Sequence, residues 1–133
     1  MATRSVIAMA TDKGFSAIYC HWDGYPEYVG AILSKHYTDA EKVQSLMAMG
    51  DASVLGIDIG PTDRPLTKEE REAHSETDPH KFAYCIFYGR DKGEEVSMAQ
   101  THGHMHYLRG YADHCGAEWL YVYTNGAWET HKI

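Results

Sequence analysis

Two apolar runs, Ser5-Val-Ile-Ala-Met-Ala10 and Phe15-Ser-Ala-Ile-Tyr-Cys20, flank the polar segment Thr11-Asp-Lys-Gly14. Short β-prone runs on either side of a polar loop that ends in Gly are typical of a β-hairpin. A second hairpin is predicted from Ala117 to His131, because it has Asn125-Gly126 between alternating apolar runs. These two hairpins indicate a largely antiparallel sheet, and the rest of the chain is interpreted outward from them.

Two helices are predicted directly after the first hairpin. Pro26 suits a first helical turn, and apolar residues then recur at helical spacing as far as His36. Thr38 or Asp39 is the expected N-cap of a second helix, Ala40 to Met49, which Gly50 ends. The apolar residues that define the buried faces of the two helices are Tyr28, Val29, Ile32, Leu33, Val43, Leu46 and Met47.

The middle of the chain is more ambiguous. Ala52 to Ile59 is either a short strand or an extended segment, and the Pro-rich, charged stretch 61–81 is expected to be a surface excursion with one helical turn. Phe82 to Tyr88 is almost continuously apolar, which predicts a central strand covered on both faces, followed by a loop over 89–93. Glu94 to Cys115 is predicted to be one long helix ended by Gly116.

These elements predict a single α+β domain over residues 1–133. Its architecture is a two-layer sandwich, in which helices cover a mostly antiparallel sheet of about five strands. The length of 133 residues and the hydrophobic share of 44% suit one domain with a real core.

Charge and cysteine usage exclude several classes of protein. The chain carries 12 Lys and Arg against 19 Asp and Glu, and the cations are not clustered, which argues against direct binding of DNA or RNA. No apolar run is long enough for a signal peptide or a membrane span, so a cytoplasmic location is expected. Cys20, Cys85 and Cys115 form no CxxC pair and are expected to be reduced. No cofactor is predicted.

The densest group of chemically versatile residues is the strand-to-helix segment Tyr19-Cys-His-Trp-Asp-Gly-Tyr-Pro26. A turn of this kind places side chains and free helix N–H groups at the end of a sheet, where a small ligand can sit. His21 and Asp23 would share a face of an extended segment and form a hydrogen-bonded pair. The alternative is structural, with Asp23 in the turn and Trp22 and Tyr25 in the core.

The same segment resembles a group of small proteins from bacteriophages and mobile elements that share an HWDGYP signature. The resemblance extends to Gly50-Asp51-Ala-Ser53, to Tyr88-Gly-Arg-Asp-Lys-Gly-Glu94 and to Gly116-Ala-Glu-Trp-Leu-Tyr121. That group has no settled biochemical role. The resemblance implies a phage accessory protein, of a kind that often acts against host defence by binding a host protein or by sequestering a nucleotide signal. It implies no catalytic residue.

Two further groups of residues are candidates. Arg90 and Lys92 precede the predicted long helix, so together with its N-terminal N–H groups they could hold an anion, although a charged turn is the simpler interpretation. His102 and His106 are four residues apart and would share a face of that helix, a spacing used for divalent metals. A solvated helix face explains these histidines with fewer assumptions, and no metal ligand is assigned.

The leading hypothesis is a non-enzymatic protein that binds a small nucleotide-like ligand and so sequesters a host immune messenger. Aromatic residues (Trp22, Tyr25 and Trp119) would stack on a base near His21 and Asp23, while cations (Arg90, Lys92 and Arg109) would meet phosphate. The main alternative is an acidic inhibitor of a host defence protein or nuclease. A small metal-dependent hydrolase is a third. Ten Tyr and three Trp also allow a homo-oligomer.

Overall fold

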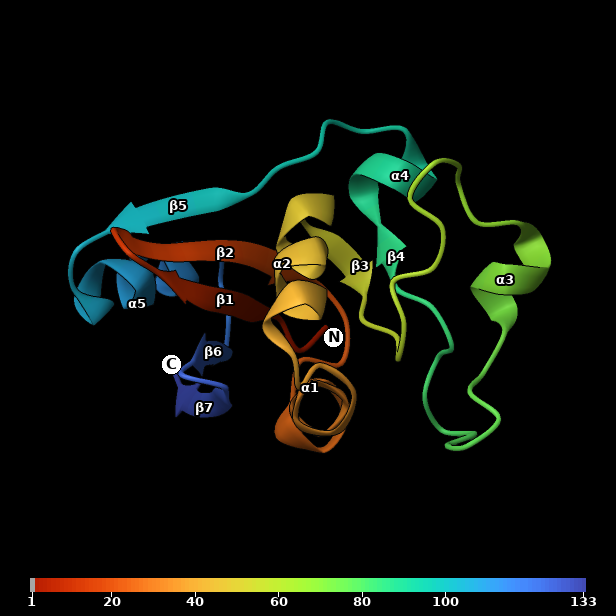
Figure 1. Cartoon of the computed structure of the whole chain (residues 1–133), viewed down its shortest axis with the longest axis horizontal. Coiled ribbons are helices and arrows are strands. Elements are labelled where there is room, and N and C mark those ends of the chain that lie inside the picture. The colour runs from red at the N-terminus through yellow and green to blue at the C-terminus, as the bar shows by residue number, and fades with distance from the viewer. Residues whose placement is uncertain (1) are drawn as a thin grey trace.

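A sheet of seven strands forms the centre of the molecule in the computed structural model, which describes residues 2–133 (Figure 1). The strand order is β4-β3-β2-β1-β6-β7, and β5 pairs with β2. The β1/β2, β2/β5, β3/β4 and β6/β7 pairs are antiparallel, whereas β1/β6 and β2/β3 are parallel. The strands are β1 (Ser5–Thr11), β2 (Gly14–Cys20), β3 (Ala52–Val54), β4 (Ile86–Phe87), β5 (Ala99–His102), β6 (Trp119–Thr124) and β7 (Ala127–Lys132).

Both predicted hairpins are confirmed. In the first, Ser5 lies opposite Cys20 and Thr11 opposite Gly14. In the second, Thr124 lies opposite Ala127, and Asn125 and Gly126 both have positive φ, 52° and 80°, which a two-residue hairpin turn of type I′ requires. Strand β6 then pairs in parallel with β1, so the two hairpins form one continuous four-stranded unit.

The two helices after the first hairpin are confirmed and cover one face of the sheet. A single π-helical turn (Pro26–Gly30) leads into α1 (Ala31–His36), and α2 (Ala40–Met49) follows. The carboxylate of Asp39 caps α2 by accepting the backbone N–H of Lys42 at 2.9 Å. The apolar residues of these helices pack on strand residues of the same face, among them Ile7, Ile18, Cys20, Tyr121 and Tyr123.

Helix α5 (Met105–His114) packs on the other face of the sheet. Leu108 and Ala112 contact a second, smaller cluster that contains Val6, Ala8, Ala17, Leu120 and Val122. Because strand side chains alternate between faces, these residues point away from Ile7 and Tyr121. The content is mixed α+β with a mostly antiparallel sheet, so the predicted fold class is confirmed; α1 and α2 form the main helical layer.

The prediction of one helix over 94–115 is wrong. Residues 94–98 have no regular secondary structure, β5 follows, and the helix begins only at Met105. Gly103 breaks the pattern with a φ of 76°, outside the right-handed helical region. The helical spacing over 94–115 predicts a buried face, but only Leu108 and Ala112 of that face are fully buried; the face consists of Met98, Thr101, Met105, Leu108, Ala112 and Cys115.

The predicted central strand over 82–88 is also wrong. Only Ile86 and Phe87 form a strand, β4, and it lies at the edge of the sheet, while residues 88–92 form the short helix α4 (Tyr88–Lys92) instead of a loop. Residues 82–85 make only isolated bridges with the neighbouring chain, from Tyr84 to Asp58 and from Phe82 to His74. Of the whole run only Cys85 and Phe87 are buried, in the cluster that α1 and α2 cover, so the apolar run predicted neither full burial nor a central strand.

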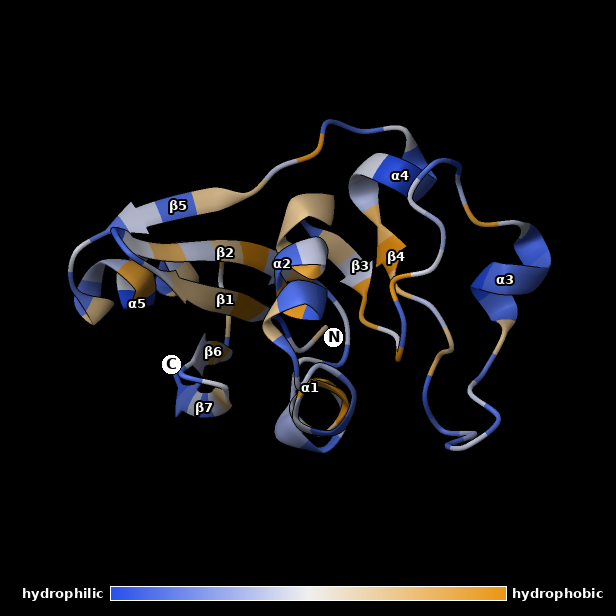
Figure 2. Cartoon of the chain, viewed as in Figure 1, coloured by the Kyte–Doolittle hydropathy of each residue, from blue (hydrophilic) through white to orange (hydrophobic). Residues whose placement is uncertain are grey.

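The stretch 61–81 runs outside the sheet and carries one short helix, α3 (Lys68–Glu72), as the sequence predicts (Figure 1). Thr67 and Glu70 form a reciprocal capping box at its start. Figure 2 shows that α3 is hydrophilic over its length. None of the helices in residues 2–133 is long and apolar enough to cross a membrane.

Candidate functional site

Aromatic, hydroxyl and cationic side chains gather where β2 and β3 end and α4 begins. Because strand side chains alternate, Tyr19 lies on the same face of β2 as Ala17, which packs against α5. We call the group the aromatic–cationic patch. It consists of Arg4, Tyr19, His21, Trp22, Ser53, Tyr88 and Lys92.

His21 is held by a hydrogen bond between its Nδ1 and the hydroxyl of Tyr19, at 2.6 Å. The backbone N–H of His21 donates to the carbonyl of Ala52 at 3.1 Å, so both the ring and the chain are fixed. Burial lowers the pKa of His21, and the positive charges of Arg4 and Lys92 lower it further. The imidazole is therefore mainly neutral at pH 7.

Trp22 stands beside this imidazole and is open to solvent. Its ring meets that of His21 edge-on, with the centroids 4.8 Å apart, and 44% of the residue is exposed. The backbone N–H of Trp22 donates to the carbonyl of Ser53 at 3.0 Å, which fixes the ring's attachment point. A large aromatic ring on a rigid backbone, with a face open to solvent, can stack on a planar ligand at a low cost in conformational entropy.

The predicted pair between His21 and Asp23 does not form. Asp23 has a φ of 56°, so the chain leaves the extended conformation there and the two side chains no longer share a face. His21 pairs with Tyr19 instead, and the Asp23 carboxylate lies close enough to Tyr25 to raise the pKa of that phenol by its negative charge. Tyr25 is 38% exposed, so it is not a core residue.

Gly24 gives the turn its fixed geometry. Its N–H donates to the carbonyl of Thr3 at 2.8 Å, and its carbonyl accepts the hydroxyl of Tyr121 at 2.6 Å. A Cβ at this position would lie 2.7 Å from both the Cβ and the Oγ of Ser5. The Asp-Gly pair of the turn is thus structural, as the alternative interpretation holds, whereas beside it Trp22 is exposed and His21 is half-buried.

Asp51 joins the two sides of the patch, and sequence reasoning missed it. Its carboxylate accepts the backbone N–H of Tyr19 on β2 at 2.8 Å, and its carbonyl accepts the backbone N–H of Tyr88 on α4 at 3.2 Å. Burial raises the pKa of Asp51, although the bond from Tyr19 opposes this. The sequence signals were its position directly after Gly50, which ends α2, and its place in the segment 50–53 that shares the resemblance to the HWDGYP group.

Lys92 supplies the exposed cation on the α4 side. Its Nζ lies 4.9 Å from the centroid of the Tyr88 ring and 3.4 Å from the Oγ of Ser53. Tyr88 and Ser53 lie in segments that share the resemblance to the HWDGYP group, but they were not predicted as site residues, because that resemblance implies no residue roles. An ammonium group, a phenol ring and a hydroxyl thus lie together at Ser53, whose backbone carbonyl also accepts the N–H of Trp22.

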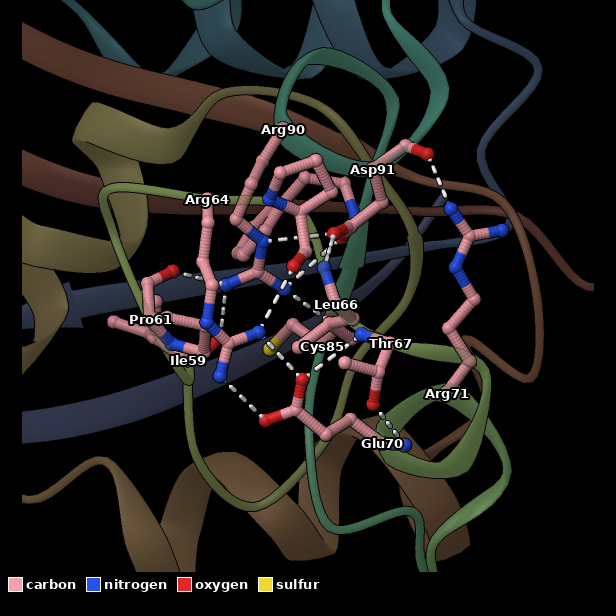
Figure 3. A network of polar contacts seen from close by, with 12 residues as sticks. Ile59, Pro61, Arg64, Leu66, Thr67, Glu70, Arg71, Cys85, Arg90 and Asp91 are labelled. Carbon is pink, nitrogen blue, oxygen red and sulfur yellow. Dashed lines mark hydrogen bonds and ion pairs between the residues drawn. The ribbon is translucent and has the colours of Figure 1, made fainter.

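Arg90, the predicted partner of Lys92, points into the protein (Figure 3). Its guanidinium forms an ion pair with the fully buried carboxylate of Asp91 and donates to the carbonyls of Ile59, Pro61 and Cys85 at 2.6 to 2.8 Å. All three nitrogens of the group have protein partners. Arg90 therefore has a structural contact set, and its sequence neighbour Lys92 is the residue that reaches the patch.

The remaining predicted residues lie outside the patch. Arg109 is on α5 and donates to the carbonyl of Lys132 in β7 at 3.3 Å. Trp119 packs against the α1/α2 side of the core, on the opposite face of the sheet from Tyr19 and His21, beneath the ammonium of Lys132. The structure thus brings together His21, Trp22 and Lys92, and separates them from Arg90, Arg109 and Trp119.

The predicted helical pairing of His102 with His106 is wrong, because His102 ends β5 and His106 lies in the first turn of α5. Within residues 2–133 no three His, Cys, Asp or Glu side chains are placed to hold a metal ion.

All three cysteines are free, and burial raises the pKa of Cys20 to about 12, so its thiol stays protonated beside His21.

Comparison of the chain with known protein families, with curated proteins and with solved structures gives no match. The fold and the site stand on the geometry alone. The resemblance to the HWDGYP group therefore stays a prediction from the sequence.

Proposed function

We propose that this chain binds a small nucleotide-like ligand at the aromatic–cationic patch. The observation that carries the proposal is that an exposed Trp22 contacts the ring of His21 and that both Trp22 and Lys92 reach Ser53, Trp22 through its backbone N–H and Lys92 through its Nζ. Trp22 would stack on a base, Lys92 and Arg4 would meet phosphate, and the hydroxyls of Ser53 and Tyr88 would meet ribose or phosphate oxygens.

The acidic character of the whole chain favours a small anion over a nucleic acid. A net charge of −7 repels a phosphate polymer that must follow an extended surface, whereas a mononucleotide or a cyclic oligonucleotide needs only local cations. In the phage setting that the resemblance implies, binding without turnover would sequester a host immune messenger. The proposal is of a non-enzymatic binding protein in the host cytoplasm.

The test is native mass spectrometry, followed by calorimetry with cyclic oligonucleotides and ADP-ribose. We expect a discrete non-covalent mass shift with at least one of them, and the same spectrum reports any homo-oligomer. Trp22→Ala and Lys92→Gln should each weaken binding about tenfold, the effect of losing one stacked base or one charge-assisted hydrogen bond. Tyr107→Ala and Lys35→Gln are matched controls, since both residues are exposed and lie outside the patch. Absence of binding to the whole panel would refute the proposal.

The second candidate function is an acidic inhibitor of a host protein, and the exposure of two aromatic residues in the same turn, Trp22 and Tyr25, favours it. Trp22 and Tyr25 are 44% and 38% exposed, and both are residue types that dominate protein interfaces. A partner with a basic surface would complement the net charge of −7. Pull-down from host lysate should then give a stoichiometric protein that high salt releases and that Trp22→Ala fails to retain.

A further inference from the structure

We propose that residues 59–72, here called the strap, position the α4 side of the patch, and that Arg71 is the positioning residue that couples the two. The structural part of this inference stands by itself, and its meaning for ligand binding rests on the proposed function. The strap contains α3, and Figure 3 shows its polar contacts with α4.

Helix α4 is too short to hold itself in place. It has five residues, and only its first carbonyls are satisfied locally, where Gly93 N–H donates to Gly89 at 3.2 Å and Glu94 N–H donates to Tyr88 at 3.0 Å. The last carbonyls of a helix have no partner within it and are stabilised by cations. Such a helix takes its position from whatever binds it from outside.

The strap binds α4 through the Arg90–Asp91 pair. The carboxylate of Asp91 accepts the backbone N–H of Leu66 in the strap at 2.9 Å, and that of Phe87 in β4 at 2.8 Å. Arg90 reaches the start of the strap, donating to the carbonyls of Ile59 and Pro61. One buried ion pair thus joins the strap, the edge strand and α4.

The side chain of Arg71 forms a hydrogen bond directly to α4. Its guanidinium donates to the carbonyl of Asp91, one of the carbonyls at the end of α4 that no backbone N–H reaches. Asp91 lies between Tyr88 and Lys92, which face the patch. The contact therefore fixes the end of the helix that carries the ammonium group of Lys92.

Arg64 provides a matched control within the same strap. It is exposed and donates twice to the carboxylate of Glu70, at 2.6 and 3.0 Å, and to the carbonyl of Pro65. These contacts are internal to the strap, so loss of Arg64 disturbs the strap without removing a bond to α4. The capping box of Thr67 and Glu70 remains in place.

Amide hydrogen exchange of Gly93 and Glu94 tests the structural part, because these two N–H groups close α4. In Arg71→Ala we expect exchange about tenfold faster than in the wild type, the effect of losing one charged donor to the helix end. In Arg64→Ala exchange should stay within about twofold of the wild type, and Arg71→Lys, which keeps a cation there, should restore much of the protection. Equal exchange in Arg71→Ala and the wild type, or equal acceleration in both alanine variants, would overturn the role of Arg71.

Calorimetry with ADP-ribose tests the link to the patch. Arg71→Ala should bind about tenfold more weakly than Arg64→Ala, with Lys92→Gln as the reference for loss of the ammonium group. Wild-type affinity in an Arg71→Ala protein whose α4 amides exchange faster would overturn the positioning role. If ADP-ribose binds no form of the protein, the proposed function fails for this probe, and the exchange measurement still decides whether the strap holds α4.

Discussion

The turn after β2, His21 to Tyr25, and helix α4 after β4 both combine aromatic and charged residues, yet they use them in opposite ways. The turn buries its glycine and leaves its aromatic side chains exposed. Helix α4 buries its oppositely charged pair, Arg90 and Asp91, and exposes the next residue, Lys92.

The difference shows how two cations next to the same acidic residue can have different roles. Both cations are adjacent to Asp91 in the sequence, but its carboxylate pairs with Arg90, which also donates to three backbone carbonyls and is a structural residue. Lys92 contacts the Tyr88 ring and the Oγ of Ser53 instead. A buried guanidinium is stable only with a partner and a full set of acceptors. A cation that binds a ligand must instead have no permanent anionic partner within the protein.

The sharpest test of this contrast is removal of the charge on Asp91. Asp91→Asn leaves the guanidinium of Arg90 buried without its anion, and we expect the free energy of unfolding to fall by about 3 to 5 kcal/mol in urea denaturation. Asp113→Asn on the exposed side of α5 should change it by no more than about 0.5 kcal/mol. A loss below about 1 kcal/mol for Asp91→Asn would show that the ion pair does not hold α4 and the strap.

The same variant should alter the acid limb of the stability curve. Burial by itself would raise the pKa of Asp91, but hydrogen bonds from Arg90, Leu66 and Phe87 outweigh burial and lower it. A carboxyl whose pKa is lower in the folded state stabilises the protein above the ordinary carboxyl pKa, and this stability is lost as the pH falls through the folded pKa. The wild type should therefore lose more stability on acidification below about pH 4 than Asp91→Asn does.

The next largest effect is expected in the turn. Gly24→Ala would place a Cβ 2.7 Å from Ser5, and the overpacking should cost about 1 to 3 kcal/mol in thermal or urea unfolding. Gly110→Ala is the matched control, because nothing lies within 4 Å of its Cβ and it sits inside α5. That variant should gain about 0.5 to 1 kcal/mol. A neutral Gly24→Ala would mean that the turn is not held by its contacts with Thr3 and Ser5.

The smallest expected effect is on the pKa of His21, and it tests how close Lys92 of α4 lies to the turn. Because burial first, and then the charges of Arg4 and Lys92, lower the pKa of His21, its imidazole should titrate below the ordinary midpoint in an NMR titration. Lys92→Gln should raise that midpoint and Lys35→Gln should leave it unchanged. An unaltered midpoint in Lys92→Gln would place the ammonium group of α4 too far from the turn for one ligand to bridge them.

Local signals predicted the elements whose geometry is set locally. The hairpin turn at Asn125-Gly126, the cap at Asp39 and the stop at Gly50 were all predicted from the sequence and confirmed, since each depends on residues within a few positions. The predicted helix over 94–115 is wrong because the positive φ of Gly103 separates β5 from α5, and helical spacing of apolar residues does not report that backbone conformation. The predicted strand over 82–88 is wrong because an apolar run does not say which element its residues pack against.

The part of the candidate site that depends on local sequence was predicted. His21 and Trp22 lie in one motif, and Lys92 was predicted as a candidate anion-binding residue before a helix. Asp51, Ser53 and Tyr88 come together with them only through the parallel contact between β2 and β3 and the short β3/β4 pair. No spacing in the sequence encodes these long-range pairings.

The parallel pairing of β1 with β6 constrains how the protein is made. Ser5 lies beside Trp119 and Met9 beside Tyr123, so one edge of the first hairpin stays open until β6 has left the ribosome. A nascent chain in that state exposes the β1 edge and the apolar residues Val6 and Ala8, which pack in one cluster with residues of α5 and β6. The sheet is therefore completed after synthesis of β6, and until then the emerging hairpin is a surface that chaperones, or another copy of the same hairpin, can bind.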